Sequence, residues 1–423
     1  MSKDKFLKEK TKKAIWNIMI PYKEKKEAAF KKIGLKESEY KNKMTEIRKK
    51  PFEDFEKNLE KAKESLENNG FKIHEAKNGQ EAGSILKNII EKSELKKIAS
   101  SKTNTGREIE MDKILKGFDW TETDLGDYVV KLFKEEDQHY VLPSLHIDAK
   151  MISQKIKEVF GDEIEADAEK CTRYLSQKIR EKILQTEIGI SGANFFTKDG
   201  SVVLLENEGN ISLISRVAQK HIVLCGIDKI VESVSDGVEL SRTAAIFGTG
   251  QYSPQYVSVI SGPSKTADIE NKLVEGAQGA KEVEIILVDN GRRKMMQEGF
   301  KDIARCINCG SCLNFCPVYN QEGAFYGGDK YIGSKGIIFS YFQENSQKAF
   351  KNGGFDCILC RGCYENCPMK IDLPEMVNKI RNYQDKEGVQ TETNKEMLEN
   401  IKKDGNPFGK EANDKTPDKL YCC

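Results

Sequence analysis

Two copies of one cysteine motif constrain this chain more than any other feature. The first runs from Cys306 to Pro317 and the second from Cys357 to Pro368, and both have the pattern C-x₂-C-x₂-C-x₃-C-P. Three thiolates at this spacing can hold three corners of an Fe₄S₄ cube, and the fourth cysteine ligates the other cluster in two-cluster proteins. A zinc site would not need four thiols in each run. The sequence therefore predicts two [4Fe–4S] clusters, in preference to zinc or disulfides.

The crossed ligation rule divides the eight cysteines into two ligand sets. The first set is Cys306, Cys309, Cys312 and Cys367, and the second is Cys357, Cys360, Cys363 and Cys316. The 40 residues between the two motifs are too many for a tight ferredoxin loop, and Lys335–Lys348 has a helical pattern. Another helix is expected to open at Leu373-Pro374, because proline is favoured in a first turn. We expect a helical two-cluster ferredoxin domain at residues 291–385.

Four further cysteines complete the twelve in the chain. Cys171 and Cys225 lie in apolar or helical patterns and are expected to be small buried side chains. Cys422 and Cys423 fall in a polar tail at residues 386–423, where a thiol or partner contact is the alternative to mobility.

Charge and hydropathy exclude several classes of protein. Lys and Arg number 68 against 67 Asp and Glu, so the chain lacks the basic excess of a nucleic-acid binder. No apolar run approaches the roughly 18 residues of a membrane helix, and the start of the chain has no apolar signal segment. We therefore expect a cytoplasmic protein without a membrane span. Residues 1–50 form a basic helical arm, either a solvated surface or a docking arm for an acidic partner.

Strand-like and helix-like segments alternate over residues 51–290. The β-rich runs are Tyr140–Leu142, Ser201–Leu205, His221–Cys225, Tyr256–Ile260 and Val283–Val288. Amphipathic stretches such as Gln80–Ser93 lie between them, which predicts an α/β domain with a mostly parallel sheet covered on both faces. Glycine-rich segments follow several strands, at the sheet edge where such folds bind ligands.

Several separate segments resemble the LUD (lactate utilisation) domain joined to a helical ferredoxin. They are residues 122–128, 141–146, 189–211, 285–295, 324–328 and 331–333. The resemblance covers roughly residues 50–385 and implies an α/β core related to sugar-phosphate isomerases and CoA transferases. It also implies work in a multi-subunit complex that oxidises L-lactate to pyruvate. Residues 261–270 are more similar to the small LUD-only subunit of that system.

A small hydroxy acid needs a cation or amide donors for its carboxylate and a base for its hydroxyl group. Residues that follow or end strand-like runs supply the catalytic candidates, which are Lys102, His146 and Glu208. The substrate-binding candidates are Asn194, Asn210, Ser264 and Thr266. Each has a structural alternative, such as a surface lysine, an ordinary hydrogen-bonded histidine, or a turn or cap residue.

Electron counting limits the function. Oxidation of a 2-hydroxy acid releases two electrons at once and each cluster accepts one, so a flavin or nicotinamide normally stands between them. Neither has a convincing motif here, since Gly248-Thr-Gly250 lacks the third glycine of a dinucleotide fingerprint.

Three hypotheses follow. The leading one is an electron-transfer subunit of a cytoplasmic lactate-oxidising complex, with cysteine-rich and LUD-only partner subunits and a LUD pocket that is a catalytic candidate. The alternative is a pure electron relay for a flavoprotein partner, in which the LUD domain serves for docking. The third is a regulatory protein whose clusters sense redox state.

Overall fold

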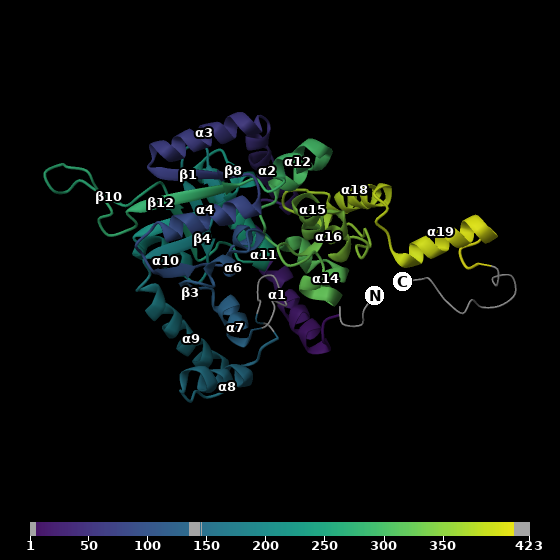
Figure 1. Ribbon diagram of the computed structural model, residues 1–423, viewed down its shortest axis with the longest axis horizontal. Coiled ribbons are helices and arrows are strands. Elements are labelled where there is room, and N and C mark those ends of the chain that lie inside the picture. The colour runs from purple at the N-terminus through teal and green to yellow at the C-terminus, as the bar shows by residue number, and fades with distance from the viewer. Residues whose placement is uncertain (1–5, 135–143, 145, 410–423) are drawn as a thin grey trace.

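The fold is built on a parallel sheet whose strands come from distant parts of the sequence. The computed structural model describes residues 6–134, 144 and 146–409 (Figure 1). Six strands pair in the order β1-β12-β7-β4-β2-β3, all parallel. They are β1 (Phe71–Ala76), β12 (Glu282–Val288), β7 (Lys220–Gly226), β4 (Ile188–Gly192), β2 (Lys97–Ser100) and β3 (Asp119–Glu122). The predicted parallel α/β core is confirmed, whereas the predicted run Tyr140–Leu142 lies outside the described residues.

Both faces of this sheet are buried, because successive side chains of a strand point to opposite faces. Val223 and Cys225 of β7 pack in the cluster that contains residues of α3 (Phe55–Asn68). Ile222 and Leu224 pack in the cluster that contains residues of α4 (Gly79–Glu91). Continuous apolar strands are therefore required at the centre of the sheet.

A second, smaller sheet lies beside the first. Its order is β8-β5-β6-β9, with β8 (Ile230–Val231), β5 (Phe195–Thr197), β6 (Val202–Glu206) and β9 (Tyr256–Ile260). β6 pairs antiparallel with β5 and β9. Two runs that the sequence indicated as strands thus belong here rather than to the parallel sheet. A short hairpin of β10 (Lys265–Thr266) and β11 (Val274–Glu275) projects from the domain (Figure 1).

The other helices of this domain begin at side-chain caps in most cases. They are α5 (Asn104–Glu108), α6 (Met111–Leu115), α7 (Leu125–Phe133), α8 (Ala149–Phe160), α9 (Ala168–Ile183), α10 (Asn210–Val217) and α11 (Val234–Thr249). The carboxylates of Asp124, Asp148 and Asp167 accept backbone N–H bonds at the starts of α7, α8 and α9. Cys171, on α9, is buried like Cys225, as expected.

The N-terminal helices are not detached from the rest of the chain. They are α1 (Glu9–Ile33) and α2 (Glu37–Lys49), followed by a 3₁₀ turn, Lys50–Phe52. Tyr40 and Met44 of α2 belong to a hydrophobic cluster shared with α11 and with the C-terminal domain. Arg48 is fully buried and donates hydrogen bonds to the carbonyls of Ile230, Asp228 and Ala304, at 2.7, 2.6 and 2.9 Å. One guanidinium thus joins α2 to both domains.

The described part of the C-terminal domain contains helices and irregular turns but no strand. Its helices are α12 (Arg292–Met295), α13 (Ser311–Asn314), α14 (Pro317–Glu322), α15 (Gly333–Gln343), α16 (Ser346–Lys351), α17 (Gly362–Glu365), α18 (Leu373–Lys386) and α19 (Glu392–Asp404). α18 opens at Leu373-Pro374 as predicted. The helix predicted over Lys335–Lys348 is two helices, because Asn345 caps α16 and ends the run. Among the described helices, none is both long and apolar enough to cross a membrane.

Candidate functional site

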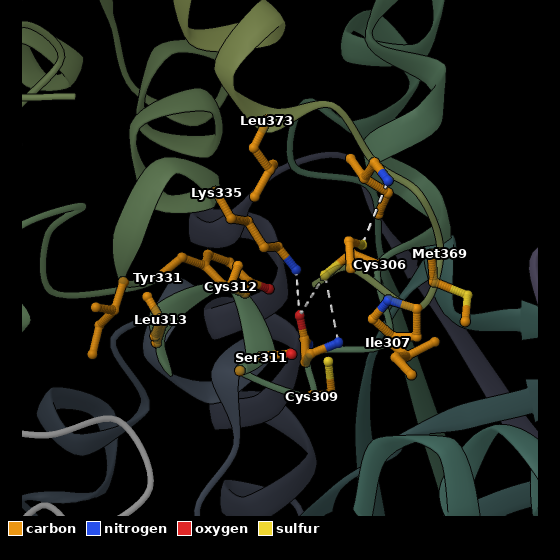
Figure 2. A pocket seen from close by; sticks show the side chains of 16 residues that line it. Cys306, Ile307, Cys309, Ser311, Cys312, Leu313, Tyr331, Lys335, Met369 and Leu373 are labelled. Atoms are coloured by element: carbon orange, nitrogen blue, oxygen red, sulfur yellow. Dashed lines mark hydrogen bonds between the residues drawn. The ribbon is translucent and has the colours of Figure 1, made fainter. Parts of the chain in front are cut away.

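The eight motif cysteines line two separate cavities. Cys306, Cys309 and Cys312 of the first motif line a cavity of about 50 Å³ together with Cys367, the last cysteine of the second motif (Figure 2). A second cavity, of about 10 Å³, is lined by Cys357, Cys360, Cys363 and Cys316. Each cavity therefore receives three thiols from one motif and the fourth from the other.

The backbone of both motifs has the same unusual conformation. Asn308 and Leu359, which precede the second cysteine of each motif, have φ values of 56° and 55°. Gly310 and Arg361, which follow that cysteine, have φ values of 80° and 63°. These left-handed residues turn the chain tightly, so that closely spaced thiols face one cavity.

Backbone amides also face the sulfur atoms. The amide of Asn308 donates to Cys306 Sγ at 3.4 Å, and that of Ile371 donates to Cys367 Sγ at 3.4 Å. The amide of Tyr319 donates to Cys316 Sγ at 3.5 Å. Such donors stabilise negative charge on sulfur and tune iron–sulfur centres.

The two cavities fit iron–sulfur clusters better than single metal ions. Within residues 6–134, 144 and 146–409, no group of three or more His, Cys, Asp or Glu side chains is arranged to hold one metal ion. The thiols instead surround a space, and a cluster is held by four thiolates at its corners.

Two lysines place positive charge beside the first cavity. Lys335 of α15 lines this cavity and its ammonium group donates to Asn308 Oδ1 (Figure 2). Lys229 Nζ donates to the carbonyl of Cys306 at 3.1 Å and pairs with Asp228 at 2.8 Å. Both lysines are buried, so water screens their charge weakly.

A buried ionic network continues from this point to the parallel sheet. Arg292 contacts Asp228 and also donates to Glu108 Oε2 at 2.9 Å. Tyr331, which lines the first cavity, donates its hydroxyl hydrogen to Glu108. Burial raises the pKa of Glu108, but the charge of Arg292 and the hydrogen bonds from Arg292, Asn290 and Tyr331 together lower it. The sequence analysis missed this network, although Arg292 lies within one of the segments that carry the family resemblance.

Three predicted site residues meet at the carboxyl edge of β2 and β3. Lys102 follows β2, and its Nζ lies 3.0 Å from Asp127 Oδ2. Glu208 accepts a hydrogen bond from the amide of Leu125 at 3.3 Å. Asn210 donates to Thr123 Oγ1 at 3.1 Å. Lys102, Glu208 and Asn210 thus lie near the start of α7.

Two aspartates complete this group, and the sequence analysis did not single them out. Asp127 pairs with Arg107 at 3.1 Å as well as with Lys102, and the two cations lower its pKa against the effect of burial. Burial and the charge of Asp127 raise the pKa of Asp124 to about 7. Desolvation and Asp127 also raise the pKa of Glu208. A sequence signal for these aspartates was present, because an acidic cluster from Glu122 to Asp127 lies at the end of a strand.

The remaining predicted residues lie elsewhere or have structural contacts. Asn194 Oδ1 accepts a hydrogen bond from the amide of Leu205 at 2.8 Å. This bond joins the residue before β5 to β6 of the second sheet. His146 lies just before α8, next to Ile147 of a small helical core. The amide of Ser264 donates to the carbonyl of Ala280, just before β12, and Thr266 donates to Asp268. Ser264 and Thr266 therefore lie at the amino edge of the sheet, opposite to Lys102.

Replacing Asp124 with asparagine is expected to stabilise the protein at pH 8 by about 1–2 kcal/mol relative to wild type, and to change little at pH 5. Asparagine caps α7 as well as aspartate does. The folded-state pKa of Asp124 is about 7 and the unfolded value is near 3.9, so the folded state binds more protons between these values. The contribution of protonated Asp124 to the free energy of unfolding is fully present below pH 4 and is lost as the pH rises through 7. Urea denaturation at both pH values measures the difference.

The matched control is Asp148→Asn at the exposed cap of α8. Hydrogen bonds from the Lys10 side chain and from the amide of Met151 lower the pKa of Asp148, so the stability that this carboxylate contributes is lost only in acid. Its substitution is expected to have the same effect at pH 5 and pH 8. If Asp124→Asn changed the free energy of unfolding equally at pH 5 and pH 8, the raised pKa of Asp124 would be contradicted.

Comparison with known families agrees with this architecture. The LUD domain family matches residues 59–288, and the 4Fe-4S dicluster domain family matches residues 302–371. The chain belongs to the LUD domain family and carries a C-terminal 4Fe-4S dicluster domain.

Relatives of similar organisation span most of the chain. Lactate utilization protein B of Bacillus velezensis is 32% identical over 81% of this chain and 71% of its own length. The protein of the same name from Bacillus subtilis is 31% identical over 83% and 72%. The "Uncharacterized electron transport protein YkgF" of Escherichia coli is 29% identical over 83% and 73%. A DUF162 family protein from Deinococcus radiodurans has a TM-score of only 0.31 at 13% identity, covering 55% of this chain and 96% of its own.

Proposed function

We propose that this chain is the iron–sulfur electron-transfer subunit of a multi-subunit oxidoreductase. The observation that carries the proposal is the pair of four-thiol cavities in the dicluster domain. In this proposal Cys306, Cys309, Cys312 and Cys367 hold one [4Fe–4S] cluster. Cys357, Cys360, Cys363 and Cys316 hold the other. Bound clusters would supply one-electron acceptors, and the relative named as an electron transport protein supports the same role.

The charges around the first cavity suit this role. Adding an electron to a cluster adds negative charge, and the buried ammonium groups of Lys335 and Lys229 stabilise that charge. The second cavity is also lined by a cation, Arg361, but that side chain is 51% exposed and pairs with Asp372 at 2.7 Å, so its charge is screened more strongly. The proposal therefore places the more easily reduced centre at the first cavity.

The reaction proposed for the complex is oxidation of L-lactate to pyruvate, which releases two electrons and two protons. Its support is the name of the relatives in two Bacillus species and the group around Lys102 at the sheet edge. Lys102 would bind the carboxylate, Asn210 would orient it, and Glu208 would accept the hydroxyl proton. The proton from C2 would pass to water, and the two electrons would pass to the two clusters, one to each. The partners would be cysteine-rich and LUD-only subunits in the cytoplasm.

One observation favours the alternative, a relay for a flavoprotein partner. Lys102 and Arg107 already share the carboxylate of Asp127, so a substrate carboxylate must compete with a partly buried ion pair. A LUD domain whose cations are all paired would serve for docking instead of catalysis.

Anaerobic reduction by L-lactate distinguishes the two proposals. If the site around Lys102 is catalytic, lactate alone will bleach the cluster absorbance of the purified chain, and Lys102→Met will abolish this bleaching. The exposed Lys116→Met is the control and should bleach like wild type. Absence of bleaching in a sample that dithionite does reduce would contradict oxidation of L-lactate by this chain alone and leave the relay.

A further inference from the structure

A large polar cavity lies between the two domains, apart from the cysteines and from the group around Lys102. Its volume is about 520 Å³, within the range of small-molecule sites. Asn78 and Gly79 line it after β1, Asn290 lines it after β12, and Lys330 and Gln343 line it from the C-terminal domain. It therefore opens at the carboxyl edge of the parallel sheet, where such folds bind ligands.

The lining of this cavity carries an excess of positive charge. Lys87, Lys113 and Lys330 line it, against the carboxylates Glu108 and Glu110. The carboxylate of Glu108 is already compensated by buried Arg292. The cavity is therefore suited to an anion with several oxygen atoms.

Two of the three lysines are free to turn toward such a ligand. Lys87 and Lys113 pair with Glu91 and Glu110 at 3.6 and 2.9 Å, and these side chains are more than half exposed. Exposed pairs of this kind contribute little energy, so a multivalent anion can replace the carboxylates. Lys330 instead pairs with Glu344 at 3.2 Å with side chains only 21% and 27% exposed, which holds its ammonium group at the wall of the cavity.

Only two side chains separate this cavity from the first cysteine cavity. Glu108 lines the polar cavity and accepts a hydrogen bond from Tyr331, which lines the cysteine cavity. Gln343, another lining residue, donates to Glu108 at 2.7 Å. Glu108 and Tyr331 are both buried, so solvent screens charge weakly along this connection.

We propose that this cavity binds a phosphate-bearing small molecule, and that this binding is coupled to reduction of the cluster held by Cys306, Cys309, Cys312 and Cys367. Lysine ammonium groups are common phosphate ligands, and the cavity is far larger than a three-carbon acid requires. An anion here opposes the negative charge added by reduction, so reduction weakens binding and binding lowers the reduction potential. The coupling rests on the proposed function, whereas the binding does not.

Calorimetric titration of the anaerobic holoprotein tests the binding, with pyrophosphate and ADP as probes and citrate as a carboxylate comparison. We expect saturable binding of the phosphate probes and at least about tenfold weaker binding by the double variant Lys113→Ala/Lys330→Ala. The control Lys116→Ala/Lys348→Ala changes lysines that do not line the cavity and should bind like wild type. No saturable binding of either phosphate probe, equal loss in both double variants, or equally tight citrate binding would overturn the proposal.

The coupling is tested by repeating the titration after reduction with dithionite. We expect severalfold weaker binding of pyrophosphate to the reduced protein. Equal affinity in both states would overturn the coupling and leave the binding site. Iron content and bleaching by dithionite are measured on the same sample, so failure of the proposed electron-transfer function is seen separately.

Discussion

Replacing Cys309 and Cys367 together with serine is expected to remove about half of the iron and sulfide, whereas replacing Cys309 and Cys316 together is expected to remove nearly all of both. The first pair lines one cavity, so the other cluster keeps all of its ligands. The second pair takes one thiol from each cavity, so both clusters lose a ligand. The two double variants remove the same number of thiols and differ only in which cavities they affect.

Iron and sulfide analysis of anaerobically purified protein measures this result, and the electron paramagnetic resonance spectrum after dithionite counts the remaining reduced clusters. Cys171→Ala removes a buried thiol that lines neither cavity and should retain full iron. If each motif instead held its own cluster, the Cys309/Cys316 variant would keep half of the iron and the Cys309/Cys367 variant would lose nearly all. That reversal would contradict the crossed ligand sets.

The three thiols that each motif contributes to one cavity could be predicted because that information is local. The spacing within each motif fixes which three thiols share a cavity, and the repeated left-handed positions, such as Asn308 and Leu359, follow from the same short segment. The parallel sheet was also predictable, since β7 and β12 are apolar on both faces. Periodicity does not identify strand partners, however, and the strands over residues 202–206 and 256–260 form a separate sheet.

The candidate substrate site was predicted only in part for the same reason. Lys102 follows β2 of the parallel sheet, whereas Glu208 follows β6 of the second sheet. Their shared position near the start of α7 therefore depends on how the two sheets pack, which no local pattern shows. Ser264 also lies in a glycine- and proline-rich turn, but a turn signal does not show at which edge of the sheet the turn lies. Asp127 was missed because its role depends on Arg107, which lies 20 residues earlier in the sequence.

The buried network between the domains could not be predicted from any local pattern. Its members are Glu108, Asp228, Lys229, Arg292 and Tyr331, and its side-chain contacts span up to 223 positions. Nothing in the sequence around Glu108 distinguishes it from a surface carboxylate. In the structure its carboxylate accepts hydrogen bonds from four side chains, and it links the parallel sheet to the first cysteine cavity.

Replacing Arg292 with methionine is therefore expected to be strongly destabilising, by about 3–5 kcal/mol, because it leaves Glu108 with an uncompensated buried charge and Asp228 with Lys229 as its remaining partner. The matched control is the neighbour Arg293→Met. Arg293 pairs with Glu56 on the surface, where the two side chains are 31% and 59% exposed, and its loss should cost about 0–1 kcal/mol. Urea denaturation of the anaerobic holoprotein, followed by circular dichroism and by cluster absorbance, compares the two variants at one neutral pH.

A second substitution separates loss of charge balance from loss of packing. In the double variant Glu108→Gln/Arg292→Met, the buried carboxylate without a partner is gone, so the protein should recover part of the stability lost by Arg292→Met alone. Cluster absorbance should be lost at lower urea than in wild type for Arg292→Met, since Asp228 and Lys229 connect the network to the carbonyl of Cys306. Equal destabilisation by the two arginine variants, or no recovery in the double variant, would show that the ion pairs do not hold the domains together. The reason to expect a large difference is that adjacent arginines with similar partners differ here almost entirely in burial, and burial determines what an unpaired carboxylate costs.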